Sequence, residues 1–299
     1  MNKKILAIFY SQTGQLEDII DHFSAPLIEA GNSVEKVRIR TKNEYPFPWT
    51  GKAFFALMPD CVKDVPTELQ PFSLKENKYD LIILGYQPWF LSPCIPFNSF
   101  MQDPKIKAVL KDTPVITITG ARNMWISAME RVKITLKNSG ALLVGNIALA
   151  DMHHNFVSFV TLLRWMFKGK KDRYLNIFPP AGVAEKDIIN TKTFGSTVVK
   201  HLEKNDWSTL QDELLQQKAV IIKYPLMFIE SKARKIFAVW AGIIIKKKNR
   251  TPWLVAFKYY LLIALFIAAP IILTVDAIFF RPFLSNRIKR QKQHYSGVN

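Results

Sequence analysis

Cysteine is scarce in this sequence. The 299 residues include two cysteines, Cys61 and Cys94, which form no CxxC pair. The chain therefore shows neither a disulfide framework nor a zinc site, and we expect no bound metal. Neither the Walker pattern G-x-x-x-x-G-K-[ST] nor the Rossmann pattern G-x-G-x-x-G occurs. Zinc-finger and RNP patterns are also missing, so nucleic acid is not an expected partner.

Acidic residues are scarce in the C-terminal region. Residues 221–299 contain 14 Lys and Arg against 2 Asp and Glu, so this region carries +12 of the net charge of +17. A basic excess concentrated in one region is typical of binding to an anionic membrane surface. The N-terminus leads straight into an apolar run without a signal-peptide pattern. We therefore expect the folded part at the cytoplasmic face of the inner membrane.

Charge is nearly absent from one long stretch near the C-terminus. Residues 253–280 carry only Lys258 and Asp276, which predicts a hydrophobic helix long enough to span a membrane. Basic clusters on both sides leave its orientation undecided. One arrangement is a simple span, and the other is a re-entrant or in-plane helix bent at Pro270. A shorter apolar stretch, residues 236–245, is predicted to lie in the membrane interface.

An apolar run followed by a short polar loop marks the N-terminus. Residues 5–10 are apolar on both faces, which indicates a central strand of a parallel sheet. Ser11-Gln12-Thr13-Gly14-Gln15 follows and opens a helix predicted over residues 15–30. Hydroxyls, a glycine and free amides at a helix N-terminus favour an anion, and this loop suits one terminal phosphate such as that of FMN. An ordinary polar βα loop has the same composition, and that alternative stays open.

Strand and helix patterns alternate along the first half of the chain, and this predicts a doubly wound α/β fold with a parallel five-stranded sheet. Residues 40–78 contain five prolines and form an insert expected to cover a ligand or partner site. An apolar helix at 155–167 either packs on the sheet or lies in a membrane interface. Three regions follow: an α/β domain at 1–150, a helical extension at 151–220, and a basic membrane-associated region at 221–299. Further strands are predicted at 33–39, 80–86, 114–119 and 141–149, and further helices at 96–102, 126–138, 185–204 and 207–218.

Three predicted loops lie at the carboxyl ends of the strands, where ligands of such sheets bind. Tyr86, Trp89 and Trp125 are expected to form flat apolar walls for an aromatic ring system. Gln87 and Asn123 are candidates for hydrogen bonds to such a ring, and Pro88, Phe90 and Gly120 belong to the same loops. Arg122 is the candidate catalytic residue that stabilises negative charge on a reduced ring. His153, beside His154, is a candidate for acid–base work, although paired loop histidines are often simply solvated.

Two of these loops resemble the flavin loops of flavodoxin-like proteins. Residues 8–15 look like the phosphate loop, and Leu84 to Phe90, continuing to Phe100, looks like the second flavin loop. The resemblance covers roughly residues 1–150 and implies a strand order of 2-1-3-4-5. It implies FMN as cofactor, with Leu16 departing from the usual hydroxyl residue. The implied cofactor-binding residues are Ser11, Gln12, Thr13, Gly14, Gln15, Tyr86, Gln87, Pro88, Trp89, Phe90, Gly120, Arg122, Asn123 and Trp125.

A narrower resemblance extends beyond that domain. The chain is similar to flavodoxin-like proteins of bacterial dialkylresorcinol and flexirubin biosynthesis, often labelled dialkylresorcinol condensing enzymes. The resemblance implies a lipophilic substrate, with a ketosynthase and an acyl carrier protein of the pathway as further partners. Condensation needs an acyl-carrying thiol with histidine partners, which neither cysteine offers. The runs that carry this match are Tyr45-Pro46-Phe47-Pro48-Trp49, Gly85-Tyr86-Gln87-Pro88-Trp89, Arg122-Asn123-Met124-Trp125 and Gly169-Lys170-Lys171-Asp172-Arg173-Tyr174.

Three functions are consistent with these patterns. The first is a membrane-attached FMN-dependent oxidoreductase of the aromatase type, which oxidises an alkylated cyclohexanedione to a resorcinol. The second is an FMN electron carrier without a substrate of its own. The third is a flavin-free scaffold protein on the same fold, an alternative that Leu16 supports. The basic, tethered character of the chain favours the first over the second, because shuttle flavodoxins are usually acidic and soluble.

Overall fold

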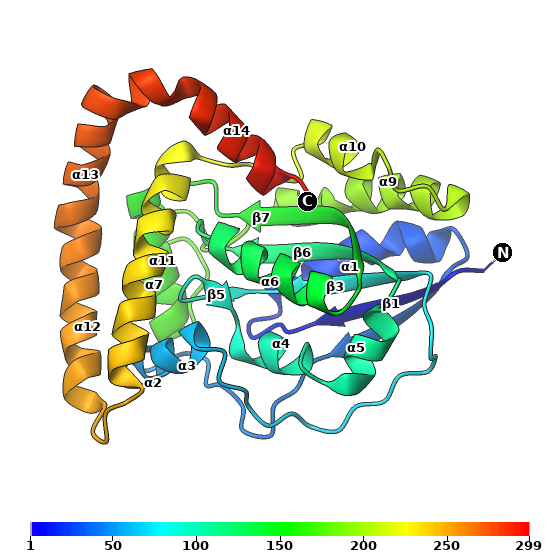
Figure 1. Ribbon diagram of the computed structural model, residues 1–299, viewed down its shortest axis with the longest axis horizontal. Helices are drawn as coiled ribbons and strands as arrows, with labels where there is room; N and C mark the ends of the chain where they lie inside the picture. The colour runs from blue at the N-terminus through cyan, green and yellow to red at the C-terminus, as the bar shows by residue number, and fades with distance from the viewer. Residues whose placement is uncertain (1, 299) are drawn as a thin grey trace.

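A five-stranded parallel sheet forms the centre of the protein. The computed structural model describes residues 2–298, and its sheet has the order β2-β1-β3-β6-β7 with parallel pairing throughout (Figure 1). This order is 2-1-3-4-5 in the sequence of the five strands, which is the flavodoxin-like doubly wound arrangement. The predicted fold class is therefore confirmed. The strands are β1 (Lys4–Phe9), β2 (Ser33–Arg38), β3 (Leu81–Tyr86), β6 (Pro114–Ala121) and β7 (Leu142–Ala150).

Helices cover both faces of this sheet. The pleat of β1 sends Ile5, Ala7 and Phe9 into one core and Leu6 and Ile8 into the other. The first core lies under α1 (Gln15–Glu29), α8 (Glu185–Ile189), α9 (Thr191–Lys204) and α10 (Leu210–Gln216). The second core lies under α4 (Ile95–Phe100), α5 (Pro104–Leu110), α6 (Ile126–Asn138) and the start of α11 (Tyr224–Ile244).

The helices after residue 184 share a core with the N-terminal domain. Phe194, Val198 and Leu202 of α9 are buried against the same cluster as Ile20 and Phe23 of α1. The two helices approach so closely that a Cβ on Gly195 would stand 2.1 Å from the carbonyl oxygen of Phe23. Only glycine leaves room for such a crossing. Residues 185–216 therefore belong to the layer that positions α1 and the loop before it.

The insert at 40–78 and the helix after β7 lie beyond the carboxyl edge of the sheet. The insert forms α2 (Gly51–Ala56) and α3 (Met58–Val62), and α7 (Asn155–Lys168) follows the last strand. A two-strand hairpin, β4 (Pro88–Trp89) with β5 (Ser92–Pro93), follows β3. The backbone N–H of Trp49 donates to the carbonyl oxygen of Met166 at 2.7 Å, which ties the insert to α7.

The C-terminal region is largely helical. The stretch at 236–245, predicted to lie in the membrane interface, is the end of α11, a helix of 21 residues. The stretch at 253–280 is helical as predicted, and it belongs to a continuous helix, Thr251–Ser296, that is long and apolar enough to cross a membrane. That helix comprises α12 (Thr251–Ile263), a π-helical turn (Ala264–Ala268), α13 (Ala269–Val275), a second π-helical turn (Asp276–Phe280), a 3₁₀ turn (Arg281–Leu284) and α14 (Ser285–Ser296).

The proline in this helix does not bend it sharply. Pro270 is the second residue of α13, directly after a π-helical turn, and the helix continues past it. Figure 1 shows the change of direction farther on, between α13 and α14. From there α14 returns toward the domain, and the Gln211 side-chain amide donates to the Ser296 carbonyl oxygen at 2.7 Å. Of the two arrangements left open, the one with a helix bent at Pro270 therefore places the bend at the wrong residue.

Candidate functional site

A cavity of about 220 Å³ lies at the carboxyl ends of β1, β3 and β6. This is the switch point of the sheet, where ligands bind in open α/β folds. The three loops contribute Gln12, Thr13, Gln15, Leu16, Gln87, Pro88, Trp89, Phe90, Gly120, Ala121 and Arg122, and Asp151 follows β7. The insert, α7 and a later segment close it with Phe47, Trp49, Phe54, Leu57, Leu162, Trp165, Met166 and Gly182.

The first loop presents unpaired donors at the start of α1. Gly14 precedes the helix with φ 87°, and a Cβ there would meet nothing within 4 Å. Ser11 Oγ accepts from the backbone N–H of Glu17 at 3.3 Å. Within residues 2–298, the backbone N–H groups of residues 12–16 and the Thr13 hydroxyl have no hydrogen-bond partner. Such donors at the positive end of a 15-residue helix fit an anion.

The two glutamines of this loop use their side chains elsewhere. Gln12 Nε2 donates to the Pro46 carbonyl oxygen at 3.2 Å. Gln15 Nε2 donates to the carbonyl oxygen of Val183 at 3.2 Å, and the Val183 N–H donates back to Gln15 Oε1 at 3.1 Å. These amides fasten the insert and the 182–183 segment over the loop. They leave the backbone N–H groups of Gln12 and Gln15 free for a ligand.

The second loop carries the aromatic wall of the cavity. Trp89 makes edge-to-face contacts with Tyr10, Tyr45 and Trp49, at centroid distances of 5.8, 5.2 and 5.7 Å. Phe90 packs on Phe54 of the insert at 4.7 Å. Phe90 and the next residue, Leu91, both have positive φ, at 47° and 62°. Consecutive left-handed non-glycine residues are strained, and the packing around this turn holds them in place.

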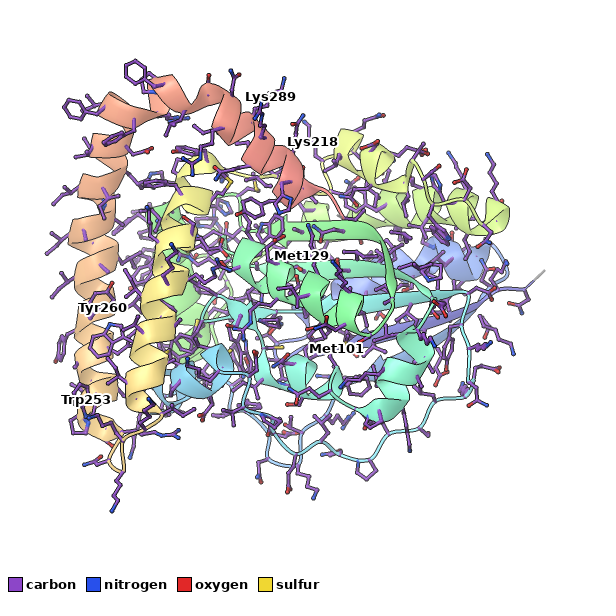
Figure 2. All side chains as sticks on the ribbon, viewed as in Figure 1. Met101, Met129, Lys218, Trp253, Tyr260 and Lys289 are labelled. Carbon is purple, nitrogen blue, oxygen red and sulfur yellow. The ribbon has the colours of Figure 1, made fainter. Side chains whose placement is uncertain are left out.

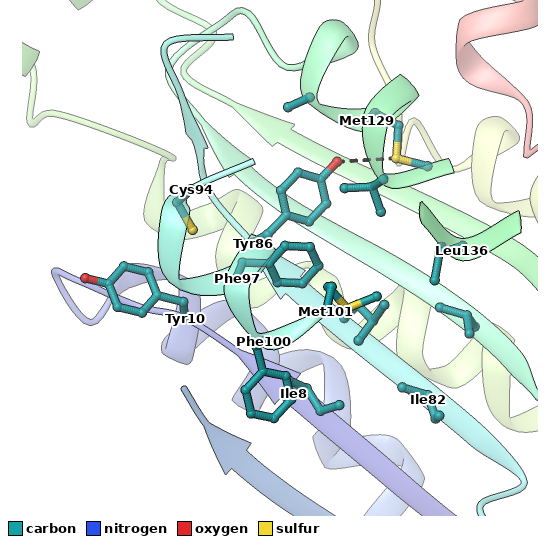
Figure 3. Close-up of a cluster of buried hydrophobic side chains, with 14 of the residues drawn as sticks. Ile8, Tyr10, Ile82, Tyr86, Cys94, Phe97, Phe100, Met101, Met129 and Leu136 are labelled. Atoms are coloured by element: carbon teal, nitrogen blue, oxygen red, sulfur yellow. Dashed lines mark hydrogen bonds between the residues drawn. The ribbon is translucent and has the colours of Figure 1, made fainter. Parts of the chain in front are cut away.

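Two aromatic residues predicted to frame the ligand lie elsewhere. Tyr86 is fully buried, packs on Phe97, and donates its hydroxyl to Met129 Sδ at 3.3 Å (Figure 3). The pleat of β3 turns Tyr86 to the α4 and α6 face, together with Ile82 and Leu84. Trp125, the residue directly before α6, is buried in the same core as Tyr86. Neither ring lines the cavity, so the prediction for both walls is wrong.

Two further predicted residues also lie away from the cavity wall. Ser11 belongs to a neighbouring polar cavity of about 180 Å³ with Arg38, Arg40 and Glu44. Asn123 donates from Nδ2 to Asn155 Oδ1 at 2.7 Å and so fastens the third loop to α7. A loop residue lines the cavity only where the backbone directs its side chain toward it. The sequence shows which residues belong to a loop but not the direction of each side chain.

Arg122 is held rigidly at the cavity by α7. Its Nη2 donates to the backbone carbonyl oxygen and to Oδ1 of Asn155, at 2.9 and 2.8 Å, and its Nε donates to Ser158 Oγ at 3.3 Å. The guanidinium also lies over the Phe159 ring, 5.3 Å from its centroid. Burial lowers the pKa of Arg122 to about 10, and the nearby Asp151 acts in the opposite direction. The group keeps its charge at neutral pH.

A carboxylate that sequence reasoning missed lines the same cavity. Asp151, directly after β7, is buried, and its Oδ1 accepts from the backbone N–H of His153 at 3.0 Å. The same oxygen lies 2.7 Å from His153 Nδ1. The imidazole of His153 does not line the cavity, and 40% of that side chain is exposed. The sequence did contain a signal for Asp151, because it directly follows the fifth strand and the carboxyl ends of the strands converge on the site.

Metal and thiol chemistry find no support at this site. In the described part of the chain, no group of three or more His, Cys, Asp or Glu side chains could hold a metal ion. Both cysteines are buried, and burial raises the pKa of Cys94 to about 12 and that of Cys61 in the same direction. Cys61 Sγ donates to the Trp89 carbonyl oxygen at 3.0 Å. A buried, protonated thiol is a poor nucleophile.

Comparison with known proteins gives distant structural likenesses. No protein-family model matches the chain, and no curated protein matches it. A flavoprotein in complex with FMN from Lactobacillus acidophilus NCFM is 16% identical, with 49% of this chain and 93% of that one covered and a TM-score of 0.40. A flavodoxin from the domain Archaea is 10% identical, with 67% of this chain and 99% of that one covered and a TM-score of 0.38. Oxidised flavodoxin 1 from Bacillus cereus is 17% identical, with 66% of this chain and 98% of that one covered and a TM-score of 0.37. The fold follows from the strand order of this chain.

Proposed function

We propose that this protein is a flavoprotein that binds FMN at the switch-point cavity and oxidises a lipophilic cyclic substrate at the membrane. The observation that carries the proposal is the juxtaposition of two features at one place. Unpaired backbone donors stand at the start of α1, and an aromatic cavity opens beside them. A phosphate-bearing aromatic cofactor needs both.

The residues of the site fit the chemistry of FMN. The free N–H groups of residues 12–16 and the Thr13 hydroxyl would hold the phosphate. Trp89 and Phe90 would bound the ring, and Gln87 would contribute a polar contact. The cavity is smaller than the roughly 300–1,000 Å³ typical of sites that enclose a whole ligand, so the phosphate end would extend along the first loop. When bound, FMN would supply a two-electron acceptor for a hydride from the substrate.

The remaining polar groups of the cavity have roles of their own. Arg122 provides a fixed positive charge beside a developing anion. The Asp151 carboxylate accepts a proton from the substrate, and His153 connects that carboxylate to solvent through its exposed ring. Loss of one hydride and one proton converts a cyclohexanedione ring into a resorcinol, so these two groups cover the charges that the oxidation generates.

The apolar surroundings support an alkylated substrate. Leu162, Trp165 and Met166 of α7 line the cavity together with Phe54 of the insert. The resemblance to dialkylresorcinol biosynthesis proteins points to an alkylcyclohexanedione, with a ketosynthase and an acyl carrier protein as partners in the pathway. The buried thiols argue against a condensing role, because neither Cys61 nor Cys94 lines the cavity.

Flavin content of the full-length protein tests this function. We expect detergent-purified protein to show a flavin absorption band and to release FMN on denaturation. Anaerobic addition of an alkylcyclohexanedione should bleach the band and yield the resorcinol. FMN that no such substrate reduces would indicate an electron carrier. Colourless protein that takes up no added FMN would overturn the proposal in favour of a scaffold.

A further inference from the structure

We propose that α12 and α13, the apolar part of the long C-terminal helix, lie flat in one leaflet of an anionic membrane and do not cross the bilayer. This deepens the membrane attachment in the proposed function and does not depend on the flavin. The membrane face is the outer side of α12 and α13. Figure 2 shows side chains projecting from it, away from the sheet. Its exposed apolar side chains include Val255, Ile263, Ile267, Ile271 and Ile278.

The helix is fastened lengthwise to the folded domain. Near its start, Arg250 pairs with Asp60 at 3.1 Å. Farther along, Phe266 meets Phe159 of α7 at 5.2 Å. Asp276 is buried and accepts a hydrogen bond from the Tyr224 hydroxyl at 3.1 Å. A helix rises about 1.5 Å per residue, so these contacts extend over roughly 39 Å. A bilayer crossing would therefore draw α7 and α11 into the hydrocarbon as well.

Charges on α11 oppose such a crossing. Two contacts show that α11 and the long helix run antiparallel. Phe237 packs on Phe257 at 5.3 Å, and the earlier Tyr224 donates a hydrogen bond to the later Asp276. Lys232, Arg234 and Lys235 lie between those two anchors and are exposed. They are thus level with the apolar middle of the long helix. Charged side chains at bilayer mid-depth are costly. In an in-plane arrangement they reach the headgroups at the edge of the membrane face.

The basic clusters fit the same arrangement. One cluster, Lys246 to Lys248, precedes the long helix, and a second one, Arg287 to Arg290, follows its apolar part. A simple span would place one of them across the membrane, against the preference of positive charge for the cytoplasmic side. With α12 and α13 in the plane, both clusters stay on the side of the membrane where the domain lies, and anionic headgroups of that leaflet attract them. That charge complementarity identifies the occupant of this face as a lipid surface.

The arrangement brings the cavity close to the lipid. Phe54 of α2 lines the cavity, while the adjacent Phe55 packs on Phe257 of the long helix at 6.3 Å. In α7, Met166 lines the cavity and Phe159 meets Phe266. One layer of helices therefore separates the cavity from the membrane face. A lipophilic ligand dissolved in the leaflet has a short route to the site.

Depth measurements on two spin-labelled variants distinguish the arrangements. Val255→Cys and Ile271→Cys change exposed positions on the membrane face, and the native cysteines are buried. The two sites are roughly 24 Å apart along the helix. In vesicles of phosphatidylglycerol and phosphatidylcholine, we expect both labels to lie at shallow depths within the same leaflet. Depths that differ by about that distance would overturn the proposal. Protein that stays off the vesicles and dimerises through this face, as seen by light scattering, would overturn it too.

Sidedness provides an independent test in inverted inner-membrane vesicles of the expression host. Lys248→Cys and Gln293→Cys mark the two ends of the helix, and Asn77→Cys marks the domain as a control. All three are exposed positions. An in-plane helix predicts that an impermeant maleimide labels all three equally. Protection of Gln293→Cys alone until detergent is added would show a span. Flavin content measured on the same vesicles separates failure of the FMN proposal from failure of this one.

Discussion

The Asp151 carboxylate and the His153 imidazole share a contact of 2.7 Å, yet only the carboxylate lines the cavity. His153 was predicted as the acid–base residue, and its neighbour Asp151 was not predicted as part of the site. The pair spans the distance from the cavity wall to solvent. In the proposed function the carboxylate therefore contacts the ligand, and the histidine provides the route for proton exchange.

Replacement of this pair should slow substrate oxidation while flavin binding persists. We expect Asp151→Asn to reduce the rate of flavin reduction by alkylcyclohexanedione roughly 100-fold, the lower end for general-base catalysis. His153→Gln should have a smaller effect, because the carboxylate stays in place. Stopped-flow bleaching of the flavin band measures both rates. His154→Asn, at an exposed neighbouring histidine, serves as the control. An unchanged rate in Asp151→Asn would contradict the assignment.

A negative charge in the first loop should abolish flavin retention. The Thr13 hydroxyl stands among the unpaired N–H groups at the start of α1, so Thr13→Asp would place a carboxylate where the phosphate is proposed to bind. We expect the purified variant to carry no FMN. Thr13→Ser keeps the hydroxyl and should retain it. Chromatography of the released cofactor gives the stoichiometry, and full occupancy in the aspartate variant would rule out this phosphate site.

The two aromatic residues at the end of β3 should behave differently. Trp89 lines the cavity, whereas Tyr86 is buried on the other side of the strand. We expect Trp89→Leu to weaken FMN binding roughly 2- to 13-fold, since an aromatic contact contributes about 0.5–1.5 kcal/mol beyond its buried area. Tyr86→Phe should leave FMN affinity unchanged. Fluorescence titration of apoprotein with FMN measures both. Equal losses would show that the effect comes from general destabilisation of the loop.

A buried carboxylate should make folding stability depend on pH. Glu230 of α11 accepts from the backbone N–H of Ser127 at 2.6 Å, at the start of α6. Burial raises its pKa to about 7. The folded state therefore binds a proton on Glu230 more tightly than the unfolded state does. The protonated carboxyl group stabilises the folded state fully below the pKa that Glu230 has in the unfolded chain. That effect is lost as pH rises through about 7.

Urea unfolding at acidic and alkaline pH tests this linkage. Glu230→Gln keeps an acceptor for the Ser127 N–H and removes the charge. We expect it to stabilise the protein above pH 7 by about 3 kcal/mol at most, the value of the pKa shift, and to flatten the pH dependence between roughly pH 4.5 and 7. Glu203→Gln, at an exposed site on α9, is the matched control. A variant as pH-dependent as the wild type would show that another group titrates.

Local patterns in the sequence determined much of this protein. The apolar run at residues 5–10, the polar loop from Ser11 to Gln15 and the strand ending at Tyr86 are features of short stretches, and the strand order implied by the resemblance agrees with the structure. The uncharged stretch near the C-terminus likewise predicted a long apolar helix. Periodicity and composition carry this information because secondary structure and burial repeat over a few residues.

The composition of the site was decided by contacts between distant parts of the chain. The Gln15 side chain donates a hydrogen bond to Val183, which is 168 residues away, and Arg122 donates one to Asn155 of α7. The pleat of β3 turns Tyr86 into the core, whereas Trp89 lies beyond the last strand residue and meets the insert. Side-chain direction at a strand end and pairing across such separations depend on packing in three dimensions. Only the tertiary structure therefore separates the residues that line the cavity from those that hold its walls together.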